Sequence, residues 1–330
     1  MSTDFTPFFR NAHLSTIASN FWKRPVSEDR FPITRRLYRT APDVQVAVDE
    51  QTPGTPPVAR AMMIHGLEGS SSSGYLLSLS HELLAAGYAV HRFNMRSCGG
   101  TEHLAISNYH AGQTSDAVAV LREIRRDWDG PLFLIGFSLG GNVSLKLAGE
   151  LGNEASGLLD GVCSVSTPLD LAACADTLEA PRNFIYENRF LKYLKGRIVR
   201  RHLQYPDLYD IKLFDDVRTI RQFDDAYTAK LFGFGTAANY FATQSSNQFL
   251  ESVRVPALMI QAKDDPLIPF EVYSHPAIRS NANLRLVATD YGGHVGFIAR
   301  NQPRFWIDPV IRGWTEEVRN KKVRSVVSIP

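Results

Sequence analysis

The stretch that most constrains the fold of this chain is a serine flanked by glycines, between a segment with a strand pattern and a segment with a helix pattern. Residues 132–135 are apolar, follow a turn signal and are typical of a strand buried on both faces. From Val143 onward, the apolar spacing favours a buried helix instead. Residues 136–140 between them read G-F-S-L-G, a G-x-S-x-G pattern. A strand that turns directly into a helix strains the middle residue and exposes its side chain, so we expect Ser138 to project at the strand's carboxyl end. The alternative is an ordinary connection in which the serine is incidental.

Strands and helices alternate along most of the chain, which predicts an α/β fold with a mostly parallel sheet and helices on both faces. Two further strands, at 35–39 and 44–48, are predicted to pair in antiparallel orientation. The other predicted strands are residues 58–64, 88–93, 159–166, 255–261 and 284–288. The predicted helices are residues 75–86, 114–126, 139–149, 270–279 and 304–319.

The alternation stops between residues 168 and 248, which are rich in aromatic and basic side chains and contain no clear buried strand. We interpret this segment as a helical lid inserted into the sheet domain at the carboxyl end of a strand, where open α/β sheets carry their sites. The core then comprises residues 1–167 and 249–330. Residues 1–33 are aromatic-rich and irregular, and we expect them to form an arm packed on the core, because disordered segments are poor in aromatics.

A serine nucleophile needs a base and an acid that orients the base, and in this architecture they follow the serine in that order. Asp265 comes just after the strand 255–261, directly before a Pro-Leu-Ile-Pro turn. Asp264 is the alternative, because boundaries read from a sequence drift by a few residues. His294 follows the strand 284–288 in a glycine-rich loop that lets the backbone approach Ser138. We therefore predict Ser138, Asp265 and His294 as the catalytic residues.

Two backbone N–H groups are predicted to form an oxyanion hole, which stabilises negative charge on a reacting carbonyl oxygen. One belongs to Leu139, the residue after the serine, and the other to Leu67, in the loop after the strand 58–64. His65 lies in the same loop, but it precedes the serine and is expected to shape the loop rather than act as the base.

Composition excludes several classes of function. A formal net charge of +2 over 330 residues is too small to indicate a nucleic-acid partner. The three cysteines have neither metal-ligand spacing nor the pattern of a disulfide framework, which suits a reducing compartment. We find no signal peptide and no transmembrane run, and we expect a soluble cytoplasmic protein with no metal and no cofactor.

Together these residues resemble an α/β-hydrolase and, more narrowly, the YheT-like hydrolases, a branch that includes eukaryotic α/β-hydrolase-domain esterases and lipases. The resemblance implies an α/β-hydrolase fold and assigns Ser138 as nucleophile, Asp265 as acid and His294 as base. One departure is Ser15, where glutamine is expected in the family's amino-terminal motif, whose role is not predicted. The membrane anchor of some eukaryotic relatives is not expected here. The matching motifs are residues 11–17, 65–69, 94–96, 136–142, 263–266 and 292–297.

The family implies hydrolysis of carboxylic esters, either lipid-like or with short acyl groups. Acyl transfer by the same residues and a catalytically silent ligand-binding protein are the alternatives. The aromatics of the lid could line an acyl pocket, although we expect most of them to form the lid's own core. An apolar helix face at Phe190, Leu191, Leu194 and Ile198 could touch a membrane, but packing within the lid is favoured. The oligomeric state is not predicted.

Overall fold

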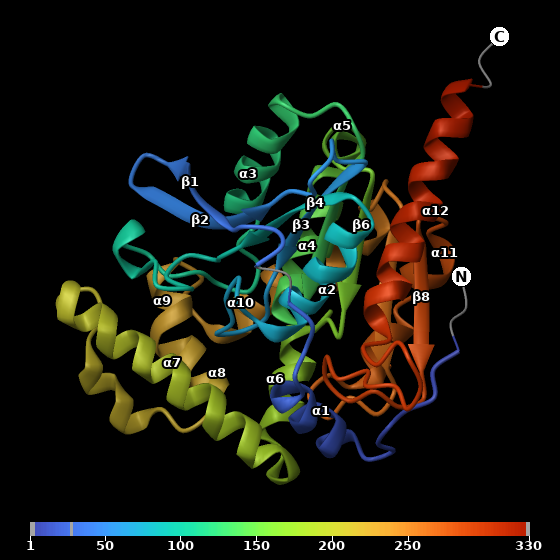
Figure 1. Cartoon of the computed structure of the whole chain (residues 1–330). Coiled ribbons are helices and arrows are strands. Elements are labelled where there is room, and N and C mark those ends of the chain that lie inside the picture. Colours follow the sequence, from blue (N-terminus) through green and yellow to red (C-terminus); the bar gives the residue numbers. More distant parts are fainter. Residues whose placement is uncertain (1–3, 27–28, 328–330) are drawn as a thin grey trace.

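The structure, a computed structural model, describes residues 4–26 and 29–327 and is built around one eight-stranded sheet (Figure 1). The strand order is β1-β2-β4-β3-β5-β6-β7-β8. The six strands β3 to β8 are parallel, whereas β1 with β2 and β2 with β4 are antiparallel pairs. This confirms the predicted fold class. The strands are β1 (Thr34–Ala41), β2 (Val44–Gln51), β3 (Ala59–Ile64), β4 (Tyr88–Phe93), β5 (Leu132–Phe137), β6 (Gly161–Val165), β7 (Ala257–Ala262) and β8 (Leu284–Thr289).

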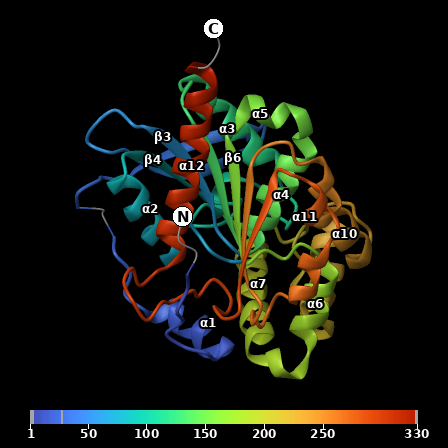
Figure 2. The same cartoon turned by 90° about the vertical axis from the view of Figure 1, so that its right-hand side faces the viewer.

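Helices cover both faces of the sheet, which explains why the central strands are apolar along their whole length. Along β5, Leu132 and Leu134 pack into one hydrophobic cluster, and Phe133 and Ile135 into the other. Figure 2 shows α2 and α12 on one side of the sheet and α4 and α11 on the other. The covering helices are α2 (Gly74–Ala85), α3 (Ser115–Arg126), α4 (Leu139–Leu151), α5 (Ala155–Leu158), α11 (Ala277–Ser280) and α12 (Ile307–Val327).

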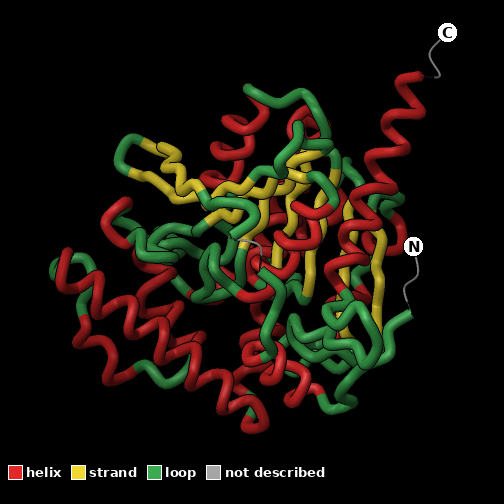
Figure 3. The backbone as a smooth tube through the Cα atoms, in the orientation of Figure 1, coloured by secondary structure: helices red, strands yellow, loops and turns green. Residues whose placement is uncertain are grey.

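Residues 168–248, called the insertion below, connect β6 to β7. Throughout this described segment the chain is helix and loop without a strand (Figure 3). Leu191, Leu194 and Ile198 are buried in a cluster of the insertion's own side chains, with Phe190 packed against it. The helix face considered for membrane contact therefore packs within the insertion. Its helices are α6 (Leu171–Glu179), α7 (Phe184–Gln204), α8 (Ile220–Phe223), α9 (Ala229–Leu231) and α10 (Ala237–Gln244).

Three local predictions were wrong. The amino-terminal arm is not irregular: it contains α1 (Ala12–Phe21), which begins where the Asn11 side chain accepts a hydrogen bond from the Leu14 N–H. The helix predicted at 270–279 is a 3-10 turn followed by the short α11, because Pro276 interrupts it. The last helix, α12, begins later and extends further than 304–319. None of the helices within the described residues is long and apolar enough to cross a membrane.

Candidate active site

Ser138 lies in the sharp turn between β5 and α4, with a φ of 51° and a ψ of −121°. A positive φ is uncommon for a residue with a side chain and is typical of functional turns. The two flanking glycines are needed because strand and helix approach closely. A Cβ on Gly136 would lie 2.1 Å from the Gly140 carbonyl oxygen, and one on Gly140 would lie 2.5 Å from the Ile64 carbonyl oxygen. The G-x-S-x-G pattern therefore fits the turn that exposes the serine.

The side chains of Ser138, His294 and Asp265 form one hydrogen-bonded line. The Nε2 atom of His294 is 2.9 Å from the Ser138 Oγ. Its Nδ1 atom is 2.9 Å from Oδ2 of Asp265 and 3.2 Å from Oδ1. Because Nδ1 faces a carboxylate, it carries the proton of the neutral ring, and Nε2 is then free to accept the serine proton.

The Asp265 carboxylate is fixed by donors on its other side. The N–H groups of Leu267 and Ile268 donate to its Oδ1 at 2.9 and 3.1 Å, and the Gln261 amide donates to its Oδ2 at 3.2 Å. The two N–H groups belong to the Pro-Leu-Ile-Pro turn that follows the aspartate. This turn therefore aims the carboxylate at the imidazole.

Asp264, the alternative acid, has another partner. Its Oδ1 accepts the N–H of Gly293 at 2.9 Å, and burial raises the pKa of its carboxyl group. The structure thus brings Asp265 to the His294 ring, while Asp264 fixes the backbone of the loop that carries the ring.

The loop after β3 contains Leu67, which lines the same cavity as Ser138. The N–H groups of the two neighbours of Leu67 are already hydrogen-bonded. The Gly66 N–H donates to the Tyr75 hydroxyl, and the Glu68 N–H donates to the Tyr109 hydroxyl, both at 2.9 Å. Within the described chain, no hydrogen bond uses the Leu67 N–H. The loop also lies against the serine, since a Cβ on Gly66 would be 3.1 Å from the Ser138 Cβ.

The second predicted donor, Leu139, is the first residue of α4. The first N–H groups of a helix have no partner inside it, and they lie at the positive end of the helix dipole. Leu67 and Leu139 line the same cavity as Ser138. Both residues predicted to supply oxyanion donors therefore line the cavity that contains Ser138.

His65 is fully engaged in holding the loop. Its Nδ1 donates to the Gly66 carbonyl at 2.7 Å, and its Nε2 accepts the Met95 N–H at 3.2 Å. Burial lowers the pKa of His65 to about 4, so the ring stays neutral near pH 7. These contacts fit a structural role for His65.

Two positioning contacts were missed in the sequence. The backbone N–H of His294 donates to the Thr16 hydroxyl at 2.9 Å, and the next N–H, of Val295, donates to the Ser166 hydroxyl at 3.0 Å. Thr16 lies on α1, in the motif whose role was not predicted. The motif at residues 11–17 was the only indication of these contacts in the sequence. In the structure, its Thr16 holds the loop that carries His294.

A cavity of about 140 Å³ extends from Ser138 and His294 into the space between the sheet edge and the insertion. Its wall is mostly apolar. Six aromatics of the insertion line it, and they are Phe190, Phe223, Tyr227, Phe232, Tyr240 and Phe241. Phe184 and Tyr193 are instead exposed, so they belong neither to the cavity nor to a core.

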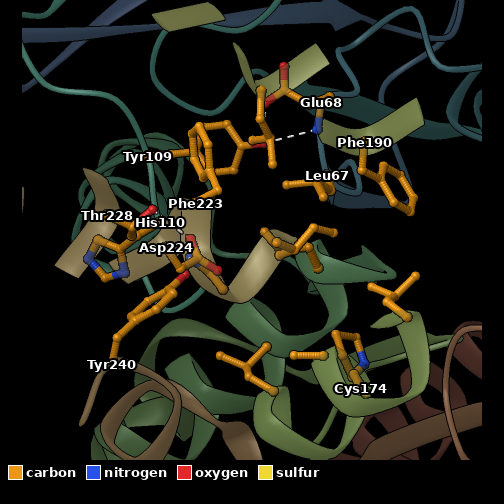
Figure 4. A pocket seen from close by; sticks show the side chains of 18 of the residues that line it. Leu67, Glu68, Tyr109, His110, Cys174, Phe190, Phe223, Asp224, Thr228 and Tyr240 are labelled. Atoms are coloured by element: carbon orange, nitrogen blue, oxygen red, sulfur yellow. Dashed lines mark hydrogen bonds between the residues drawn. The ribbon is translucent and has the colours of Figure 1, made fainter. Parts of the chain in front are cut away.

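One buried ion pair in this wall joins the insertion to the loop after β3. Nη2 of Arg197, on α7, is 2.9 Å from Oε1 of Glu68, and both side chains are less than a tenth exposed. The guanidinium also lies over the Tyr109 ring, 4.5 Å from its centroid, and Nη2 contacts the Cys98 sulfur at 3.1 Å. Glu68 directly follows Leu67, so this pair ties the insertion to the loop that carries one of the two predicted oxyanion donors. Figure 4 shows Leu67 and Glu68 in the pocket wall.

Known proteins resemble this chain over most of its length. Residues 61–306 match the alpha/beta hydrolase family. The chain is 32% identical to "Putative esterase YheT" of Escherichia coli, covering 95% of this chain and 93% of that protein. It is 31% identical to "Phospholipase ABHD3" of Mus musculus, covering 74% of this chain and 59% of that longer protein. A solved esterase structure from Pyrococcus furiosus matches with a TM-score of 0.56 at 17% identity, covering 92% of this chain and 98% of that one, and supports the fold alone.

Proposed function

This chain belongs to the α/β-hydrolase family, in the YheT-like branch that its motifs predicted, and we propose that it hydrolyses carboxylic esters through an acyl-enzyme on Ser138. The observation that carries the mechanism is the hydrogen-bonded line from Ser138 through His294 to Asp265. The names of the relatives, an esterase and a phospholipase, support ester substrates.

In the first half-reaction, the Ser138 oxygen attacks the ester carbonyl while Nε2 of His294 takes the serine proton. The carbonyl oxygen becomes negative, and the N–H groups of Leu67 and Leu139 donate hydrogen bonds to it. The tetrahedral intermediate then collapses, and His294 gives its proton to the leaving alkoxide, which departs as an alcohol.

In the second half-reaction, His294 takes a proton from water, and the resulting hydroxide attacks the acyl-enzyme carbonyl. Collapse releases the carboxylic acid and returns the proton to Ser138. Asp265 keeps the imidazole in the productive tautomer and stabilises its charged form. The mostly apolar cavity suits an apolar acyl or alcohol group. No step in this cycle needs a metal or a cofactor.

The test is Ser138→Ala against nitrophenyl esters of increasing chain length. We expect turnover to fall by about 10⁴-fold or more, because the nucleophile and its proton path are both lost. A fluorophosphonate should label the wild-type protein and fail to label the variant. Ser156→Ala, a change at an exposed serine on α5, is the matched control and should behave as wild type. Unchanged turnover in pure Ser138→Ala protein would refute the mechanism.

A further inference from the structure

One wall of the cavity carries polar side chains that the proposed mechanism does not use. Figure 4 groups the labelled His110, Asp224, Thr228 and Tyr240 on one side of the pocket, away from Leu67 and Phe190. All four of these polar residues line the cavity that contains Ser138. Buried polar groups in an apolar pocket usually fix the orientation of a ligand.

Asp224 is the first residue of a π-helical turn, η5 (Asp224–Thr228), in the insertion. The Thr228 hydroxyl donates to its Oδ1 at 2.6 Å. No hydrogen bond or ion pair to its Oδ2 is found in the part of the chain that the structure describes. The nearby Arg221 pairs with Asp176 and Glu179 instead. The carboxyl group therefore has an unused acceptor atom inside the cavity wall.

His110 supplies a donor in the same wall. Its Nδ1 accepts the Gly112 N–H at 3.2 Å, which places the proton of the neutral ring on Nε2. Burial lowers the pKa of His110 to about 3, so the ring remains neutral at physiological pH. Its ring centroid is 4.7 Å from that of Phe232 and 6.0 Å from that of Tyr240. The aromatic neighbours fix the plane in which this donor lies.

Tyr240 connects this wall to the serine. Its hydroxyl accepts the Ala111 N–H at 2.7 Å and retains its own proton to donate. Burial and the nearby Asp224 carboxyl raise its pKa well above the usual value. Tyr240 also belongs to a hydrophobic cluster against which Leu139 packs. Leu139 follows the proposed nucleophile, so Ser138, this cluster and Asp224 all border the same cavity.

We propose that Asp224 is a specificity-determining residue that binds a free hydroxyl group on the substrate, at the end remote from the ester. The inference rests on the proposed function. A hydroxyl fits this wall because it can donate to the open Asp224 oxygen and accept from a donor such as His110 Nε2–H. An anionic group would meet a carboxyl group and no free cation within the described wall. Burial raises the pKa of Asp224 to about 7, so roughly half of these carboxyl groups are protonated and uncharged at pH 7.

The experiment compares matched esters that differ only in one hydroxyl. The first pair is nitrophenyl 6-hydroxyhexanoate and nitrophenyl hexanoate, which places the hydroxyl on the acyl group. The second pair is the monohexanoyl ester of butane-1,4-diol and butyl hexanoate, which places it on the alcohol. We expect wild-type protein to favour the hydroxylated member of one pair by tenfold or more in kcat/KM. The pair that shows the preference identifies which part of the substrate enters the cavity.

Asp224→Leu should reduce that ratio to near one, because the hydroxylated ester loses its hydrogen bond to the carboxyl group and the plain ester has none to lose. Asp224→Asn should keep part of the preference, because an amide still accepts and donates hydrogen bonds. Asp207→Leu, at an exposed acid in the insertion, is the control and should keep the wild-type ratio. Thermal unfolding of each variant shows whether it is folded.

Three outcomes would overturn the inference: no preference in either pair, a preference that survives in Asp224→Leu, or an Asp224-dependent preference for hexanoylcholine over both hydroxylated esters. The last result would assign the wall to a cation. Failure of the proposed function is distinguishable, because wild-type protein would then turn over neither plain ester and Ser138→Ala would change nothing.

Discussion

Asp264 and Asp265 are adjacent in the sequence, but their carboxylates have different partners in the structure. Asp265 contacts the His294 ring, whereas Asp264 accepts a backbone N–H from the loop that holds the ring. The two side chains have the same chemistry. Their difference follows from which one the turn after β7 directs into the site.

We therefore expect Asp265→Asn to lower kcat by about 10³- to 10⁴-fold, because an amide does not stabilise the charged imidazole and favours the wrong tautomer. Asp264→Asn should cost about tenfold or less, since an amide oxygen can still accept the Gly293 N–H. Steady-state kinetics with a short nitrophenyl ester at pH 8 measures both. Equal losses in the two variants would contradict the assignment of the acid.

Asp308 is a buried carboxyl group away from the site, at the start of α12. The Ser78 hydroxyl donates to it, and Arg24 and Glu82 act on it from nearby with opposite effects. Burial is the largest influence and raises the pKa of Asp308 to about 7. The folded protein therefore retains this proton at pH values where the unfolded chain, with a pKa near 4, has lost it.

This difference in pKa between the folded and unfolded states determines how stability changes with pH. As pH rises from 5 to 7, the folded state binds more protons at Asp308 than the unfolded state, so the free energy of unfolding should fall by up to about 1.4 kcal/mol per pH unit. Asp308→Asn should flatten this slope in urea unfolding measured between pH 5 and 8. Asp129→Asn, at an exposed site, should keep it. Parallel curves for wild type and Asp308→Asn would refute the assignment.

At the scale of elements, α7 and the loop after β3 are joined by the pair of Arg197 and Glu68. Removing one partner leaves the other charge buried, so Arg197→Met should cost about 3–5 kcal/mol in the free energy of unfolding. Arg200→Met on the same helix breaks a partly exposed pair with Glu102 and should cost about 1 kcal/mol or less. Urea unfolding compares the two variants. Similar losses would show that the Arg197 pair adds nothing beyond a surface contact.

The elements that the sequence predicted well are those that are buried on all sides. The strand containing Phe133 and Leu134 is buried on both faces, so its apolar run is unambiguous. The positions of Ser138, Asp265 and His294 followed because parallel strands bring their carboxyl ends to one edge of the sheet.

What the sequence could not predict depends on contacts between distant segments. Thr16 and His294 are 278 residues apart, and no local pattern indicates that the hydroxyl of one accepts the N–H of the other. α1 was missed because its helix has an exposed apolar side: Leu14, Ile17 and Phe21 are 54%, 40% and 79% exposed. Such a face lacks the polar outer pattern on which helix prediction relies.

At the scale of the whole molecule, the insertion shares its packing with the sheet domain. Leu169, Cys174 and Tyr186 belong to the same hydrophobic cluster as the strand residues of one sheet face. The Asn142 side chain on α4 also bonds the backbone of Gln244 and Ser246 near the end of the insertion. Segments that share a core usually unfold together.

We therefore expect a single thermal transition in calorimetry, with equal calorimetric and van't Hoff enthalpies, provided that unfolding is reversible. A first transition that removes the helices of the insertion while the sheet persists would show that the insertion folds independently. Circular dichroism and tryptophan fluorescence followed in parallel would reveal such a difference.

The insertion also lies between the proposed nucleophile and the proposed acid and base in the sequence. A cut at the exposed Asp207 leaves Ser138 and Arg197 on the first piece, and Asp265 and His294 on the second. Neither piece alone would hold a complete set of reacting groups. If each were fused to one of two proteins of interest, colour from a chromogenic ester would appear only when those proteins met. The arrangement of this chain thus lends itself to a split reporter.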